Sequence, residues 1–177
     1  MSDALLSSFT PENFRAVLHE AGYRAELMSD RPNGPYLRSA TGGVPFEVQF
    51  VNKLANSDGY ADVTLAVIVR VEGKLPLAAV NDWNNGRRFG RLRLVGEVVI
   101  LDMDVSAVGG VTPTHLRTLI GIWDQLAQDA TLHLRNTLAR LGAQGQGAGP
   151  AVAPLPASGT IPAEGAASPR PAAKSLN

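Results

Sequence analysis

The sequence predicts an α+β fold, in which helices pack against an antiparallel sheet of about five to six strands. Apolar residues alternate with other residues around positions 44–50 and 63–71, and a period of two is typical of strands with one buried face. Short connections between such segments favour antiparallel pairing. Segments with helical spacing lie at the two ends and in the middle of this region. Because they do not alternate regularly with the strands, a doubly wound nucleotide-binding fold is disfavoured.

The first predicted element is an N-terminal helix that begins after Thr10. Thr10 is a suitable N-cap, Pro11 suits the first turn, and the carboxylate of Glu12 complements the helix dipole. Gly22 is a suitable C-terminal stop. The apolar residues between these signals share one face of the helix and are Phe14, Val17, Leu18 and Ala21.

Four strands are expected next, separated by short turns. The first two cover residues 23–29 and 36–40, and the two with the clearest alternation follow around 44–50 and 63–71. Pro45 lies near the start of the third segment. Since proline has no backbone donor, this position indicates the beginning of a strand or an exposed edge.

A short middle helix and a hairpin follow. The helix is expected at residues 76–85, with Leu77, Val80 and Trp83 or Asn84 at helical spacing. Strands at 89–95 and 98–105 then flank the two-residue turn Gly96-Glu97.

Counting outward from this turn sets the register of the hairpin. It places Arg91 opposite Asp102 and Phe89 opposite Asp104. It also directs Leu92 toward the core.

The last helix is predicted from Thr112-Pro113 to about Leu141. Beyond it the composition changes, since 22 of the 36 residues from 142 to 177 are Ala, Gly or Pro. Such a segment has too little apolar surface to offset the entropy of ordering. We therefore expect a domain at residues 8–141 and a disordered tail at 142–177. The apolar side of the helix comprises Leu116, Ile120, Trp123, Ala127, Ala130, Leu134, Leu138 and Leu141.

Composition excludes several classes of function. The chain has no cysteine, so it has no disulfide, thiolate zinc site or cysteine nucleophile. Sixteen basic and sixteen acidic residues cancel, which argues against a general nucleic-acid binder. His115 and His133 lie about 27 Å apart along one helix at 1.5 Å per residue, so they cannot hold one metal ion. His19 has no local partner, and we expect no metal and no cofactor.

Asp102 and Asp104 are the best candidates for a pair of functional carboxylates. Two residues apart on a strand, they project from the same face. One hypothesis is a divalent-cation or acid–base site. The alternative, which we favour, is structural: the hairpin register makes Arg91 and Asp102 a cross-strand ion pair.

The densest basic cluster occupies residues 87–93. Arginine interleaved with an aromatic residue is typical of nucleic-acid binding, but neutralisation by Asp102 favours a protein partner instead. The residues expected to form a mixed apolar and basic protein-binding patch are Phe89, Arg91, Arg93 and Ile100.

Three blocks of this sequence together resemble the bacterial YbjN-domain family. The most specific is Asn81-Asp82-Trp83-Asn84-Asn85-Gly86-Arg87-Arg88-Phe89-Gly90-Arg91. Residues 99–105 and 109–112 follow it, while the N-terminal helix at 10–23 and the strand at 35–39 fit the same pattern. The resemblance covers about residues 8–141.

The resemblance implies a fold like that of type III secretion chaperones: a curved antiparallel sheet with helices against it, commonly dimeric and non-enzymatic in that wider group. It also implies a bacterial sensory transduction regulator, without catalytic residues to carry over. We interpret the recognisable positions as structural, with Trp83 as a core anchor and with Gly86 and Gly90 as backbone-permissive points. Arg91 and Asp102 complete this structural motif.

Together these features predict a non-catalytic regulatory or chaperone-like module that binds a protein segment on its sheet or along an edge strand. The alternative is a metal-dependent hydrolase or small-molecule sensor that uses Asp102 and Asp104. The resemblance and the long apolar helix with Trp123 also predict a homodimer. We expect a cytoplasmic location and no membrane partner, because the N-terminus lacks a signal-peptide pattern and no segment has about 18 uninterrupted apolar residues.

Overall fold

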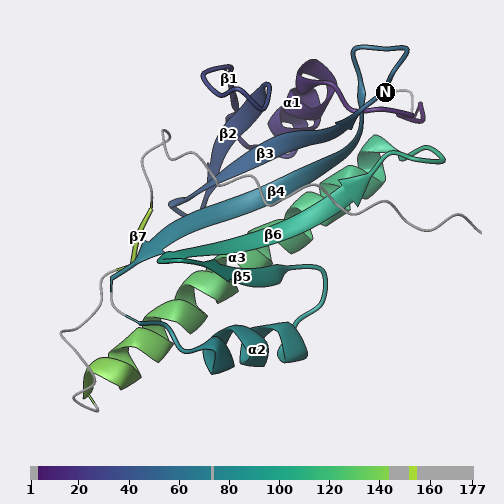
Figure 1. Cartoon of the computed structure of the whole chain (residues 1–177). Coiled ribbons are helices and arrows are strands. Elements are labelled where there is room, and N and C mark those ends of the chain that lie inside the picture. Colours follow the sequence, from purple (N-terminus) through teal and green to yellow (C-terminus); the bar gives the residue numbers. More distant parts are fainter. Residues whose placement is uncertain (1–3, 73, 144–151, 155–177) are drawn as a thin grey trace, which may run out of the picture.

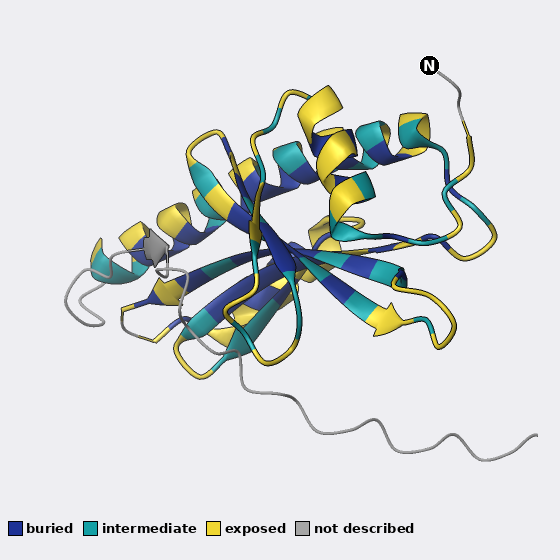
Figure 2. Cartoon of the chain, turned by 90° about the horizontal axis from the view of Figure 1, so that it is seen from above, coloured by how far each residue is buried: buried dark blue, intermediate teal, exposed yellow. Residues whose placement is uncertain are grey.

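The computed structural model describes residues 4–72, 74–143 and 152–154, and within them it has an α+β architecture (Figure 1). Six strands pair antiparallel in the order β1-β2-β3-β4-β6-β5 and form an open sheet, while β7 pairs with β4 outside that path. Figure 2 shows α1 and α3 together on one side of this sheet. The predicted fold class is confirmed. In chain order the elements are α1 (Pro11–Glu20), β1 (Glu26–Met28), β2 (Tyr36–Thr41), β3 (Val44–Lys53), β4 (Tyr60–Val71), α2 (Leu77–Gly86), β5 (Arg91–Val95), β6 (Val98–Ser106), α3 (Pro113–Ala143) and β7 (Val152–Pro154).

Helix α1 begins where the sequence predicts. The Thr10 hydroxyl accepts a hydrogen bond from the backbone N–H of Asn13 at 3.2 Å, and the Asn13 side chain accepts one from the Thr10 N–H at 2.9 Å. These two bonds form a capping box, with asparagine in place of the usual Glu or Gln. Phe14, Val17 and Leu18 are buried against the sheet.

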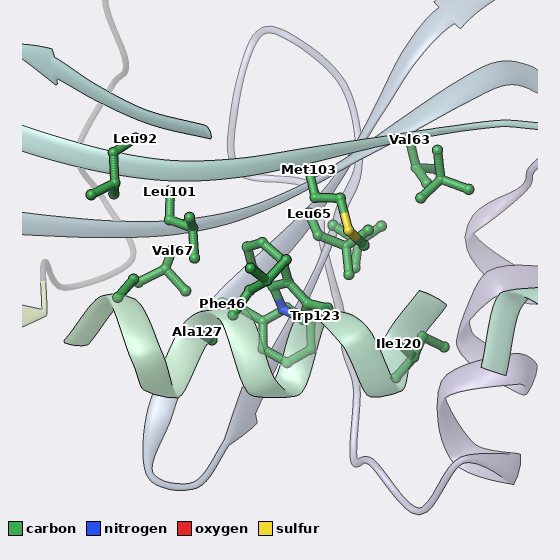
Figure 3. Close-up of a cluster of buried hydrophobic side chains, with 14 of the residues drawn as sticks. Phe46, Val63, Leu65, Val67, Leu92, Leu101, Met103, Ile120, Trp123 and Ala127 are labelled. Atoms are coloured by element: carbon green, nitrogen blue, oxygen red, sulfur yellow. The ribbon is translucent and has the colours of Figure 1, made fainter. Parts of the chain in front are cut away.

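The core lies between the helix-facing side of the sheet and the long helix α3 (Figure 3). Alternate residues of β3, β4 and β6 point into it, and Trp123 of α3 packs edge-on against Phe46 with ring centroids 5.9 Å apart. The predicted apolar side of α3 is buried except for Leu141, which is half-buried. Burying one large apolar side chain contributes about 1.5–3 kcal/mol, so this layer is the main source of stability.

Two of the predicted strands are shorter in the structure. β1 spans only Glu26–Met28, instead of residues 23–29. β5 begins at Arg91 rather than at Phe89, because Phe89 has a left-handed φ of 68° and the Gly90 N–H donates to the Arg88 carbonyl in a tight turn. The prediction that Phe89 pairs with Asp104 is therefore wrong. The register from Val95–Val98 to Arg91–Asp102 is confirmed, including Leu92 opposite Leu101.

The predicted apolar face of helix α2 is confirmed at Val80 and Trp83, but Leu77 does not belong to it. Leu77 is 66% exposed, whereas Ala79, Val80 and Trp83 are buried. The physical reason is that α2 packs beside the outermost strand β5 and touches α3, so only the side that carries these three residues meets the domain. No helix of the described residues is both long and apolar enough to cross a membrane.

The segment at residues 142–177 lies mostly outside the described residues. Its first two residues complete α3, and residues 152–154 form the short strand β7 on β4. The prediction of a disordered tail concerns the remaining part and stays a prediction.

Candidate functional site

The family-like block at residues 81–91 connects α2 to the edge of the sheet. The Trp83 indole N–H donates to the Gly90 carbonyl at 3.1 Å. The Asn84 side-chain amide donates to the Leu92 carbonyl at 3.0 Å and accepts from the Leu92 N–H at 2.9 Å. This reciprocal pair is what a neighbouring strand would form with Leu92. Asn84 thus occupies the outer edge of β5 at Leu92.

Gly90 lies in a crowded position where the chain passes from α2 into β5. A Cβ atom on Gly90 would lie 3.1 Å from Leu126 Cδ1 and 3.2 Å from Leu101 Cδ1, which is closer than ordinary contact. By contrast, a Cβ on Gly86 would have no atom within 4 Å, and Gly86 has no positive φ. A side chain at position 90 would therefore be tight and would need Leu126 and Leu101 to shift, whereas the geometry gives no steric reason for glycine at position 86.

The second face of the sheet carries the charged part of the candidate patch. Asp102 is 3% exposed, and its carboxylate accepts from Arg91 Nε at 3.1 Å and from Arg93 Nε on the other oxygen. Arg91 is 61% exposed and Arg93 is 33% exposed, so their stems cover the buried carboxylate while they still present charge to solvent. The predicted pairing of Arg91 with Asp102 is confirmed, and Arg93 shares it.

Asp104 projects from the same face as Asp102, as the sequence predicts, but its surroundings differ. It is exposed and accepts a hydrogen bond from the Thr64 hydroxyl at 2.6 Å across the β4–β6 pair. The Asp102 oxygens are held by two guanidinium groups. Among the described residues no group of three or more His, Asp or Glu side chains is placed to hold a metal ion.

The apolar members of the candidate patch are placed very differently. Phe89 is 63% exposed, and its left-handed φ of 68° places it outside the strand pairing of the hairpin. Ile100 lies opposite Arg93 and Ile68 in the sheet and is only 2% exposed. The accessible part of the patch consists of Phe89, Arg91 and Arg93.

A second charged cluster, which the sequence did not reveal, lies on the same face of the sheet but at strands β2 and β3, where Glu47 is opposite Ala66 and Ala66 is opposite Asp102. Arg31 donates two hydrogen bonds of 2.7 Å to the two oxygens of Glu47, and its guanidinium stacks 4.1 Å from the ring centroid of Tyr36. The hydrogen bonds that Arg31 donates to Glu47 raise the pKa of Arg31, and burial raises the pKa of Tyr36 above its ordinary value of 10.0. Because Arg31 lies in the connection between β1 and β2 and Glu47 lies on β3, no local sequence signal links them.

The three histidines are not brought together. His19 and His115 are exposed on different helices. His133 is half-buried, with Nε2 2.9 Å from the Ala79 carbonyl and its ring 5.7 Å from that of Trp83. Its contacts join α3 to α2.

Fold and site define an α+β domain in which a tryptophan–asparagine block closes one edge of an open sheet and an arginine pair covers a buried aspartate beside it. The family model for YbjN, "Putative bacterial sensory transduction regulator", matches residues 10–136. The chain belongs to the YbjN family. The comparison with curated proteins found no match. The likeness to type III secretion chaperones that the sequence resemblance implies stays a prediction.

Proposed function

We propose that this chain is a non-catalytic regulatory module that binds a protein partner through the surface formed by Phe89, Arg91 and Arg93. The observation that carries the proposal is that Phe89 is 63% exposed two residues before Arg91, and that Arg91 and Arg93 remain accessible while they neutralise Asp102. Exposed aromatic residues and arginines are enriched at the energetic centres of protein interfaces. The description of the family as a transduction regulator agrees with this role.

A protein partner fits this surface better than a nucleic acid does. Arg91 and Arg93 are both bonded to Asp102, and the chain has equal numbers of basic and acidic residues. Nucleic-acid affinity depends on basic residues that are free to neutralise phosphates. An acidic and apolar protein segment needs only one or two such contacts, with Phe89 supplying apolar area.

The hydrolase alternative with Asp102 and Asp104 is less well supported. A metal-binding or acid–base carboxylate needs accessible oxygen atoms, whereas Asp102 is buried and engaged by two arginines. We propose a structural role for this carboxylate, as the anchor that holds both arginines over the sheet. The module is proposed to act in the cytoplasm as a homodimer, which analytical ultracentrifugation at high micromolar concentration will test.

The test of the binding surface is quantitative affinity capture from the native cell with three full-length proteins. The double variant Phe89→Ala/Arg91→Glu should lose proteins that the wild type retains, because it removes the apolar contact and reverses one charge. The matched control is Leu132→Ala/Arg15→Glu, which alters an exposed leucine and an exposed arginine on other elements. If the patch variant keeps every protein that the wild type and the control capture, the surface is wrongly assigned.

A further inference from the structure

Strand β3 stops pairing with β4 before either strand ends. Their register runs from Lys53–Tyr60 to Glu47–Ala66, and its next hydrogen-bonded position would place Pro45 opposite Ile68. The β2–β3 hairpin turns through Gly42 and Gly43 and closes at the Thr41–Val44 pair, so the backbone nitrogen of residue 45 points toward β4. Proline has no N–H to donate there. The ladder therefore ends at Ala66.

The result is an edge within the sheet at residues 68–71 of β4, which we call the 68–71 edge. The Val71 N–H donates to the backbone carbonyl of Glu97 at 2.9 Å, on the side of β4 that faces β6. Because backbone groups alternate along a strand, those of Ile68 and Arg70 point to the opposite side, where β3 is no longer paired. An unpaired edge of this kind is a template for another extended chain.

An apolar cavity adjoins this edge on the side of the sheet that faces α3. Its volume is about 70 Å³, and its lining includes Pro45, Val67, Val69 and Leu134. In a strand paired with β4, the residue opposite Val69 is on the same face as Val69. In a strand added at the 68–71 edge, the residue opposite Val69 therefore points toward this small apolar cavity. The cavity favours an uncharged residue of modest size at that position.

In this structure the chain's own strand β7 is paired at the 68–71 edge. The register places Val69 opposite Pro154, Arg70 opposite Ala153 and Val71 opposite Val152. This pairing covers three residues, compared with nine in the register between β4 and β6. The segment from Ala151 to Leu155 contains no charged residue, and residues 144–151 join it to α3. A short tethered strand of this kind competes at an effective concentration in the millimolar range.

We propose that the 68–71 edge is an acceptor site for an extended, uncharged, apolar segment of a protein partner, and that β7 occupies this site as an internal competitor. The inference rests on the proposed function, because it supplies a second contact for the same regulatory module. A partner strand that pairs with Ile68 as well as with residues 69–71 gains backbone hydrogen bonds that the three-residue β7 register lacks. Binding then exchanges one strand for another and releases the C-terminal segment.

The test uses the full-length chain and a fluorescent peptide with the sequence of residues 150–155. In the variant Ala153→Pro, the residue opposite Arg70 can no longer donate to β4, so the internal competitor is weakened. The matched control is Ala166→Pro, which makes the same change outside β7. We expect the peptide to bind Ala153→Pro at least about tenfold more tightly than it binds the wild type or the control, since removing a tethered competitor frees the site. A peptide that itself carries the Ala153→Pro change should not bind.

Amide hydrogen exchange gives a second measurement on the same proteins. The N–H of Arg70 should exchange faster in Ala153→Pro than in the wild type, and added peptide should restore its protection. Equal peptide affinity for the wild type and the variant would overturn the role of β7 as a competitor, and no peptide binding to either would overturn the acceptor site. Neither result depends on Phe89 or Arg91, so a failure here is distinguishable from a failure of the proposed binding surface.

Discussion

Two of the places where a strand could add to the sheet are protected by different means. At the outer edge of β5, the Asn84 amide forms both hydrogen bonds with Leu92, and Trp83 fastens the same helix to Gly90. At the 68–71 edge, which Pro45 creates, the protection is the three-residue pairing with β7. The first edge is closed by side chains of the folded domain, so opening it disrupts packing. The second is closed by a strand that can be exchanged without loss of the core.

The largest effect is expected from Trp83→Ala, which removes the anchor of α2. The side chain is 2% exposed, and truncating a buried tryptophan costs about 3–5 kcal/mol of unfolding free energy. Urea denaturation is the measurement. Leu77→Ala on the same helix is the control, and because Leu77 is 66% exposed its effect should stay within about 0.5 kcal/mol. Similar losses for both variants would mean that α2 does not secure the β5 edge.

A smaller loss is expected from Asp102→Asn, which removes the buried charge that joins β5 to β6. Hydrogen bonds to a charged group contribute about 1.5–3 kcal/mol. The partial exposure of both arginines reduces the expected loss to about 1–2 kcal/mol, because solvent screens the charges. Asp104→Asn, at an exposed position on the same strand, should change stability by less than about 0.5 kcal/mol. If the two variants unfold alike, Asp102 does not anchor the hairpin.

Asn84→Ala tests the closure of the β5 edge directly. Loss of the two bonds to Leu92 should cost about 1 kcal/mol, because Asn84 is exposed and water replaces part of the interaction. The exchange rate of the Leu92 amide should rise about fivefold, which is the equivalent of that energy at 25 °C. Asn85→Ala is the control, since Asn85 is also exposed on α2. An unchanged Leu92 exchange rate would show that the side-chain amide does not protect this edge.

The smallest change in stability is expected from Pro45→Ala, which returns a donor opposite Ile68. The new hydrogen bond and the greater freedom of the unfolded chain oppose each other, so the net change should stay within about 1 kcal/mol. The informative measurement is the exchange of the new amide at position 45, which should be slow. Ala40→Gly, at the residue opposite Pro45 in β2, is the control, because it adds no amide donor on β3. A rapidly exchanging amide at position 45 would show that the missing donor is not what ends the β3–β4 ladder.

Local signals in the sequence predicted much of the fold. The capping residues around Thr10 define the start of α1, and the turn Gly96-Glu97 sets a register that brings Arg91 to Asp102. Other features depend on contacts between distant elements. Leu77 has the right spacing for a buried residue, but the position of α2 beside β5 leaves it in solvent. Phe89 fits a strand pattern, yet the turn before Gly90 gives it a left-handed backbone and exposes it.

The candidate site divides in the same way. The sequence brings Arg91, Arg93 and Asp102 onto one face because they belong to a single hairpin. It indicated neither the burial of Ile100 nor the bonds of Asn84 to Leu92, because burial and edge closure depend on how α2, β5 and the rest of the sheet pack. The pair of Arg31 with Glu47 was missed for the same reason, since Arg31 lies in the connection between β1 and β2 and Glu47 lies on β3.

By itself the sequence determined the α+β class, the helix starts, the hairpin register and the family resemblance, because these follow from residue periodicity, capping chemistry and local turns. Only the tertiary structure decided which sheet edges are open and what protects them. The position of Pro45 in the sequence indicates a strand edge. Whether that edge can accept another strand depends on how β3, β4 and α3 pack around it. Hydrogen bonding between strands is a property of neighbours in space, and the sequence orders neighbours only along the chain.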